Sequence, residues 1–410
     1  MLPEGWRVAK LSDLLERVVR QVKLDPDRLY GELGIRSHGR GVFHKAPLAG
    51  AEIGEKRVFE VVEDALVLNI VFAWEQAVAL TSHREVGLVA SHRFPMYRPK
   101  VSNCDLRFLL HYLLSPKGKE LLELASPGGA GRNRTLGQAA FEATSITCPP
   151  LREQIQIAQI LDTWDKAIDV AERLAENAEL QRGLLLEEMV AGVSSRLQNT
   201  QFKRLVDVLA PIEAGVSVNG EDSPAGQGQV GVLKISAVTK GVFDRRQNKC
   251  VRADEVSRAR VNPKADRVIV SRCNTAALIG ASAYIESDHF DLYLPDKLWL
   301  LSPKSPDAVS MKWLANWLSA KSTRELISSF ATGSSSSMKN ISKDQLLNLR
   351  MPLPPPLAQI EISSALGAWE KASSNLRSQV EMLRDERQQL LAQLLSGSRR
   401  VAAAKLGAQV

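Results

Sequence analysis

Residues 34–45 combine glycines with side chains that can contact a polyanion. The segment reads GIRSHGRGVFHK and places three bases, two histidines and a phenylalanine among three glycines. Glycine lets the backbone approach a ligand closely, and Arg, Lys and His donate hydrogen bonds to phosphates and bases. These residue types predict nucleic-acid contacts from Arg36, His38, Arg40 and Lys45. A metal-binding pair of His38 and His44, or histidines that are merely exposed, are the alternatives.

Further basic clusters recur along the chain. Arginine and lysine pair with phosphates and guanine, and asparagine pairs with adenine, so these types suit DNA recognition. For any single residue the alternative is a solvated charge or an ion pair inside a turn. The candidates in the first half are His92, Arg93, Arg132, Asn133 and Arg134. The candidates in the second half are Lys234, Lys240, Arg245, Arg246, Arg272, Asn274, Lys339 and Asn340.

Motifs for catalysis are missing from the sequence. There is no GxxxxGK[ST] phosphate loop, no HExxH metal pair, no GxSxG nucleophile elbow and no Asn/Asp-Pro-Pro-aromatic motif of adenine methylation. The four cysteines are scattered without a CxxC pair, which predicts reduced thiols and no structural zinc. We therefore predict no catalytic residue, no metal and no cofactor in this chain. The remaining alternative is an enzyme whose catalytic residues are dispersed and form no recognisable motif.

The distribution of charge points to a polyanionic partner. Residues 153–190 carry nine acids and three bases, and residues 358–395 carry five acids and four bases. Because the whole chain has a net charge of +7, the rest of the chain has a net charge of +14. A basic excess outside these two segments favours nucleic acid over a peptide partner, although a merely soluble basic surface is the alternative. No signal peptide or long apolar run is present, so we expect a cytoplasmic protein.

Two segments carry the same heptad stripe. From Ile157 apolar residues recur at alternating steps of four and three for about five heptads, and the pattern returns 205 positions later. Both stripes hold a tryptophan at the equivalent position and one arginine, Arg182 or Arg387. We predict an internal duplication whose long helices form an antiparallel coiled coil; two unrelated surface helices are the alternative. The predicted interface residues are Ile157, Leu161, Trp164, Ile168, Met189, Ile362, Leu366, Trp369, Leu376, Val380, Leu383 and Leu394.

The remaining sequence divides around these helices. We predict a first globular domain over 1–150, a first long helix over 151–196, a second globular domain over 197–356, and a second long helix with its tail over 357–410. The fold class is α+β, with two globular domains of mixed α/β structure, a long two-helix coiled coil between them and a pseudo-twofold repeat. Periodicity predicts shorter helices over 8–19, 106–124 and 311–329.

Several motifs resemble the specificity subunit of type I restriction–modification systems. The two Pro-Pro-Leu segments (149–151 and 355–357) precede Glu153-Gln154 and Gln359, and the long helices end at Gly192 and Gly397. The stretches RGVFHK (40–45), ASHRF (90–94) and PGGAGR (127–132) are similar to one recognition domain of the family, and VLKIS (232–236) and IVSRCNT (269–275) to another. One departure is Ala358, which stands where the first repeat has Glu153.

The resemblance implies a non-catalytic, sequence-specific DNA-binding subunit. Two target-recognition domains would each bind half of a split DNA target, and the coiled coil would set the gap between the halves. The implied partners are double-stranded DNA, two adenine-methyltransferase subunits carrying S-adenosylmethionine and, in restriction systems, motor-nuclease subunits, with no membrane. A coiled-coil scaffold that tethers two peptide-binding domains is the alternative from another functional class.

Overall fold

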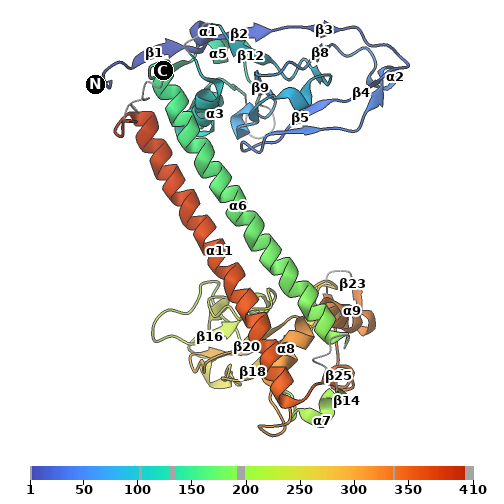
Figure 1. Cartoon of the computed structure of the whole chain (residues 1–410). Coiled ribbons are helices and arrows are strands. Elements are labelled where there is room, and N and C mark those ends of the chain that lie inside the picture. Colours follow the sequence, from blue (N-terminus) through green and yellow to red (C-terminus); the bar gives the residue numbers. More distant parts are fainter. Residues whose placement is uncertain (1, 101–103, 129–133, 192–198, 336–337, 402–410) are drawn as a thin grey trace, which may run out of the picture. The chain divides into compact units, whose positions relative to one another are not determined.

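The computed structural model describes residues 2–100, 104–128, 134–191, 199–335 and 338–401 (Figure 1). The chain forms two compact units: residues 1–171 with 378–410 make up unit 1, and residues 172–377 make up unit 2. Each unit combines helices with small, mainly antiparallel sheets, so the predicted α+β class with an internal repeat is confirmed. Within the described ranges, no helix has the length and apolarity needed to span a bilayer.

Unit 1 is built on short strands joined by long-range pairing. One sheet has the order β10 (Val78–Leu80), β9 (Leu66–Leu68), β12 (Met96–Pro99), β2 (Leu15–Val18). A second has the order β11 (Val89–Ser91), β8 (Val58–Glu60), β3 (Gln21–Val22), and β1 (Arg7–Lys10) pairs with β13 (Ser145–Cys148). Two small ribbons complete the set: β4 (Leu29–Tyr30) with β7 (Leu48–Ala49), and β5 (Leu33–Ile35) with β6 (Val42–His44).

The predicted helix over 8–19 is wrong. The segment contains β1, one helical turn α1 (Leu11–Leu14) and β2. Pairing of β1 with β13 and of β2 with β12 outweighs the local helical period, because the long-range ladders satisfy the backbone. The predicted helix over 106–124 is divided into α3 (Leu106–Leu114) and α4 (Pro116–Leu124), because Pro116 starts a new helix after the cap Ser115.

Unit 2 repeats this plan. The strand β14 (Gln201–Arg204) pairs with β25 (Arg350–Leu353), as β1 pairs with β13, and α7 (Leu205–Val208) follows β14. Helices α8 (Met311–Ser319) and α9 (Lys321–Phe330) correspond to α3 and α4. Unit 2 also contains the short helix α10 (Lys343–Leu347), and unit 1 contains the short helices α2 (Gly50–Ile53) and α5 (Gln138–Ala143).

Three sheets form the rest of unit 2. The largest has the order β15 (Glu213–Ala214), β22 (Leu298–Leu301), β18 (Arg267–Ser271), β20 (Ser282–Ile285). The second has the order β17 (Asn248–Cys250), β16 (Gly231–Leu233), β21 (Leu292–Tyr293), and only its β16–β21 pair is parallel. The third joins β19 (Cys273–Asn274), β24 (Met338–Asn340) and β23 (Thr332–Ser335).

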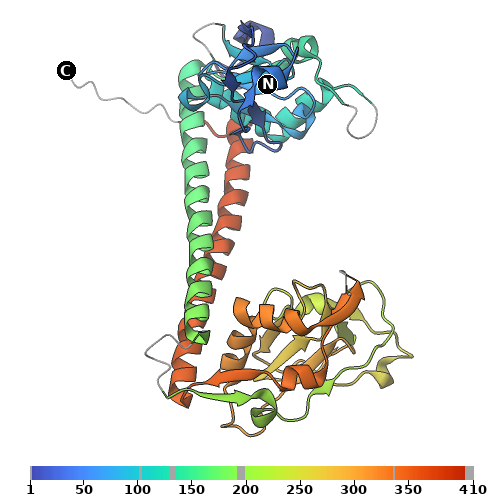
Figure 2. The ribbon, with the colours of Figure 1, turned by 90° about the vertical axis from the view of Figure 1, so that its right-hand side faces the viewer.

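The long helices α6 (Leu151–Val190) and α11 (Pro356–Ser396) lie side by side in opposite directions within each unit (Figure 2). In unit 1, Arg387 forms an ion pair with Asp165, and in unit 2 Arg182 approaches Glu370 at 3.9 Å. As residue numbers rise along α6, the numbers of their partners on α11 fall. This confirms the predicted antiparallel packing inside each unit.

The heptad stripe faces the helix partner and the domain cores. Most of the predicted interface residues are buried, whereas Trp164, Leu376 and Leu383 are half-buried and Trp369 is 40% exposed. Ile157 and Leu161 share a core with Leu390 and Leu394 in unit 1, and Met189 shares one with Ile362 and Leu366 in unit 2. Complete burial of such a side chain stabilises the fold by about 1.5–3 kcal/mol.

Hydrogen bonds at the helix starts reproduce the sequence repeat. Gln154 accepts a hydrogen bond from the backbone of Asp105 at 2.9 Å and donates to Pro149 at 2.9 Å. Gln359 accepts one from Ser310 at 2.9 Å and donates to the carbonyl of Pro354 at 2.8 Å. All three positions differ by 205, so the two halves share one structural register. Each buried glutamine anchors a long helix to its own domain.

The start of α6 has an additional anchor in unit 1. Glu153 is 9% exposed and accepts hydrogen bonds from the indole of Trp6 at 3.1 Å and from Arg400 at 2.9 and 3.1 Å. The buried carboxylate therefore joins the residue before β1, the start of α6 and the segment that follows α11. The equivalent position in unit 2 is Ala358, which has no polar side chain for such a contact.

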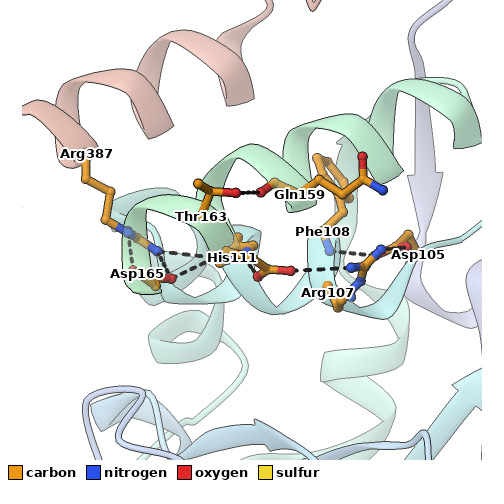
Figure 3. Close-up of polar contacts among 9 residues, drawn as sticks. Asp105, Arg107, Phe108, His111, Gln159, Thr163, Asp165 and Arg387 are labelled. Atoms are coloured by element: carbon orange, nitrogen blue, oxygen red, sulfur yellow. Dashed lines mark hydrogen bonds and ion pairs between the residues drawn. The ribbon is translucent and has the colours of Figure 1, made fainter. Parts of the chain in front are cut away.

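A second polar network fixes α3 against α6 and α11 in unit 1 (Figure 3). Nε2 of His111 lies 2.9 Å from Oδ1 of Asp162, and Arg107 contacts Oδ2 of the same carboxylate at 3.4 Å. Arg387 contacts Asp165 and lies 3.3 Å from Nδ1 of His111. Because Arg387 can only donate, Nδ1 must accept, and the proton of the neutral ring lies on Nε2.

This network predicts a pH dependence of stability. Burial of His111, with the nearby Arg387 guanidinium, lowers its pKa below the ordinary 6.5, although Asp162 opposes the change. The unfolded state therefore binds more protons, and stability present above pH 6.5 is lost as the pH falls through the lowered pKa, by at most about 1.4 kcal/mol per pH unit. The thermal unfolding midpoint should fall more steeply below pH 6.5 in wild type than in His111→Asn, the residue type that unit 2 has at Asn316. Parallel curves for the two proteins would contradict the assignment.

Candidate nucleic-acid interface

Residues 69–76 of unit 1 form a backbone hub that positions three basic segments. The carbonyls of Glu75 and Gln76 accept hydrogen bonds from the turn at residues 38 and 39, at 2.7 and 3.0 Å. Ile70 donates to the carbonyl of Arg93 at 3.0 Å and accepts from Leu136 at 2.8 Å. The Gln76 side chain donates to the end of α3 at the carbonyl of Leu113, 3.0 Å away. The hub therefore ties the 36–41 turn, the 92–94 turn and the 134–136 segment to one helix.

The first basic segment is the turn between β5 and β6. His38 adopts a left-handed conformation with φ 60°, as do Gly39 and Gly41 with φ 67° and 75°. Glycine reaches this region without strain, and at Gly39 an added Cβ would also lie 2.8 Å from the side chain of Leu114. The tight turn leaves Arg36, His38 and Arg40 exposed.

Two arginines of unit 1 stack on aromatic rings. The guanidinium of Arg36 lies 5.0 Å from the ring centre of Phe43, and that of Arg134 lies 5.7 Å from the ring of Trp74. Stacking holds a guanidinium in place while its donors remain available to a phosphate or base. The sequence analysis does not predict Phe43 or Trp74 as site residues. For Phe43 the signal was its position between Arg40 and Lys45.

The other predicted cations of unit 1 differ in their partners. Lys45 forms an ion pair with Glu32 at 3.6 Å. His92 and Arg93 are exposed in the turn between β11 and β12. Within the described ranges, neither Arg93 nor Arg40 forms an ion pair. Arg132 and Asn133 lie outside the described residues.

In unit 2, one predicted group lies in the loop between β16 and β17. Its two ends meet through the backbone of Lys234, which donates to Gln247 at 2.9 Å. Lys240 is exposed, whereas Arg245 pairs with Asp291 at 2.8 Å and Arg246 with Asp244 at 3.1 Å. The hydrogen bond from Arg246 lowers the pKa of the Asp244 carboxyl.

The second group of unit 2 lies on β19 and β24. Asn274 opposes Lys339 across this pair, and Cys273 opposes Asn340, so three of the predicted residues share one ribbon. Arg272 precedes the ribbon and donates to the backbone carbonyl of Asp296 at 2.7 Å and to its carboxylate at 3.3 Å. These two contacts hold the Arg272 side chain against Asp296. The side chain of Lys339 donates to the carbonyl of Gly333 at 3.1 Å.

A metal centre is not assembled in the part of the chain that the structure describes. No set of three or more His, Cys, Asp or Glu residues there could hold a metal ion. The four cysteines are buried and unpaired. Burial raises the pKa of the Cys104 thiol to about 12 and also raises the pKa of Cys148, which opposes formation of a nucleophilic thiolate.

Comparison with known proteins gives the family. The family described as "Type I restriction modification DNA specificity domain" matches the chain twice, over residues 3–182 and 199–382. The specificity subunit of the type I restriction enzyme EcoEI of Escherichia coli is 24% identical over 182 residues, which cover 44% of this chain and 30% of that protein. The EcoKI specificity subunit of E. coli strain K12 is 24% identical over 269 residues, 62% of this chain and 56% of that protein.

These alignments span less than two thirds of the curated relatives, and a solved structure extends the likeness in fold. The S subunit of a type I restriction–modification system from M. genitalium aligns over 96% of this chain and 97% of its own, with a TM-score of 0.59 and 12% identity. The two matched segments cover both halves of the repeat derived above. The chain belongs to the type I restriction–modification DNA specificity family.

Proposed function

We propose that this chain is the DNA-recognition subunit of a type I restriction–modification complex. The main support is that the family model matches the chain twice. Each match coincides with one globular region and its long helix. Unit 1 and unit 2 would each bind one half of a split DNA target. Because the candidate DNA-contacting turns of unit 1 differ from the loop and ribbon of unit 2, the two half-sites would have different sequences. The chain itself would carry out no catalysis.

The exposed cations support DNA as the ligand. Arg40, Arg93 and Lys240 are exposed without an ion pair to a described residue, so their charges are available to phosphates. Arg36 and Arg134 are stacked on aromatic rings, which suits directed contacts to bases or phosphates. The cations held by acids, such as Arg272 and Arg245, would mainly shape the loops.

The partners follow from the same proposal. Two adenine-methyltransferase subunits, each binding S-adenosylmethionine, would assemble on this chain in the cytoplasm. Motor-nuclease subunits would join in a complex that also restricts DNA. A scaffold that tethers two peptide-binding domains remains the competing function from the sequence, and the family match does not favour it.

Salt dependence tests DNA binding by the full-length chain in its methyltransferase assembly. The logarithm of the association constant should fall linearly with the logarithm of salt, with a slope of about −0.9 per neutralised phosphate. Arg93→Ala and Arg40→Ala should each weaken binding and reduce the magnitude of this slope by about 0.9, the value for one phosphate contact. Lys119→Ala, which removes an exposed lysine paired with Glu123 on α4, is the matched control. Affinity that does not respond to salt, or equal slopes in all four proteins, would rule out these phosphate contacts.

Helix length tests the bipartite reading of DNA. Seven residues inserted after Val170 in α6 and after Glu381 in α11 preserve the heptad register and add about 10.5 Å of helix. Methylated sites mapped by sequencing should keep both half-sites and gain about three base pairs of gap, since base pairs are spaced by about 3.4 Å.

The single insertions are the controls for this experiment. Seven residues in α6 alone, or in α11 alone, shift one stripe against the other and should abolish methylation without producing a new gap. A double insertion that methylates sites with the original gap would contradict a spacing role for the helix pair.

A further inference from the structure

Each unit has a junction where a short helix packs against both long helices. Only the junction of unit 1 contains a carboxylate at its centre. In unit 1, α3 meets α6 and α11 around the carboxylate of Asp162, which contacts both His111 and Arg107. The register of 205 maps this junction onto α8, α11 and α6 of unit 2. The ion pairs follow the same register, because Asp165 with Arg387 corresponds to Glu370 with Arg182.

The central carboxylate is missing in unit 2. Gly367 stands in place of Asp162, and the shorter Asn316 stands in place of His111. A Cβ added to Gly367 would meet no atom within 4 Å, so the space of the missing side chain is open. A cleft of about 380 Å³ occupies this place. Its lining includes Arg182, Lys312, Asn316, Ser363, Gly367 and Glu370.

Loss of the carboxylate changes the charge of the junction. Five equivalent positions in unit 1 hold three carboxylates and two arginines, for a net charge of −1. The same positions in unit 2 hold one carboxylate, one lysine and one arginine, for a net charge of +1. The cations therefore outnumber the acids where unit 1 has its own anion. The unit 1 residues are Asp105, Arg107, Asp162, Asp165 and Arg387, and the unit 2 residues are Ser310, Lys312, Gly367, Glu370 and Arg182.

Polar atoms at the cleft have no hydrogen-bond partner. Ser363 is 7% exposed, and its hydroxyl is buried without a partner. Nε of Arg182 is also buried and unpartnered, while the rest of its guanidinium lies 3.9 Å from Glu179 and from Glu370. Buried polar groups are normally satisfied, so these atoms mark a place where a bound group could supply a partner that the protein does not. Nζ of Lys312 lies 5.2 Å from the ring of Tyr284, which holds this cation at the cleft.

We propose that this cleft of unit 2 binds a phosphate group where unit 1 has the Asp162 carboxylate. Arg182 and Lys312 supply the positive charge, and Ser363 lies beside them in the lining of the cleft. A tetrahedral oxyanion with several acceptor oxygens suits donors that come from α6 and α8 together. The other charged groups that line the cleft are Glu286, Glu370, His289 and Arg245, and Arg245 is paired with Asp291. The phosphate can come from a small molecule or from a DNA backbone, and the site stands independently of the proposed DNA recognition.

The test uses inorganic phosphate and the full-length chain at constant ionic strength. In wild type, phosphate in place of chloride should raise the thermal unfolding midpoint with a saturable dependence on concentration. Gly367→Asp restores the carboxylate of unit 1 and should weaken phosphate binding at least about tenfold. Gly367→Ala, which adds no charge and favours helix, should keep the wild-type affinity within about twofold. Lys312→Gln, on the exposed face of α8, should also lose about tenfold.

A duplex DNA arm identifies the source of the phosphate. Competition between DNA and inorganic phosphate, with weaker duplex binding by Gly367→Asp, assigns the site to the DNA backbone. Unchanged duplex binding by a Gly367→Asp variant that has lost the phosphate response assigns it to a small molecule. The proposal is overturned if wild type shows no phosphate effect beyond that of chloride, or if folded Gly367→Asp and Lys312→Gln respond like wild type.

Discussion

Burial of the heptad stripes of α6 and α11 is the interaction on which both units depend. The core of unit 1 contains Leu390 and Leu394 from the end of α11, and the core of unit 2 contains Leu186 and Met189 from the end of α6. Each globular core is therefore completed by a helix that starts in the other half of the sequence. A single large-to-small substitution in such a core typically costs about 2–5 kcal/mol, so loss of either stripe destabilises both cores.

The repeat explains how one register serves two purposes. Gln154 and Gln359 make the same pair of hydrogen bonds, which fixes the start of each long helix to its own domain. Polar residues around this shared frame differ. Unit 1 closes its helix junction with His111 and Asp162, whereas unit 2 leaves a cleft beside Gly367. The duplicated halves therefore share the residues that anchor the long helices, whereas the polar residues at the helix junction differ between the two units.

The sequence predicted the long helices well, because a heptad pattern that recurs after 205 residues carries information over many turns. It failed over residues 8–19, where pairing with β13 and β12, strands distant in sequence, decides the structure. The sequence predicted which residue types could contact DNA, but it did not predict which of these cations are paired with acids inside the protein. Asp291 and Asp296 engage Arg245 and Arg272, and only folding brings these acids to them. The junction of His111 and Asp162 was hidden because its residues are spread over three helices.

The most direct test of the central claim is the affinity of the intact assembly for duplexes that differ only in the gap between the two half-sites. If both units bind one duplex at a spacing set by α6 and α11, affinity should peak at one gap and fall about tenfold or more when a base pair is added or removed. Equal affinity across the series would contradict a fixed spacing and with it the role assigned to the helix pair.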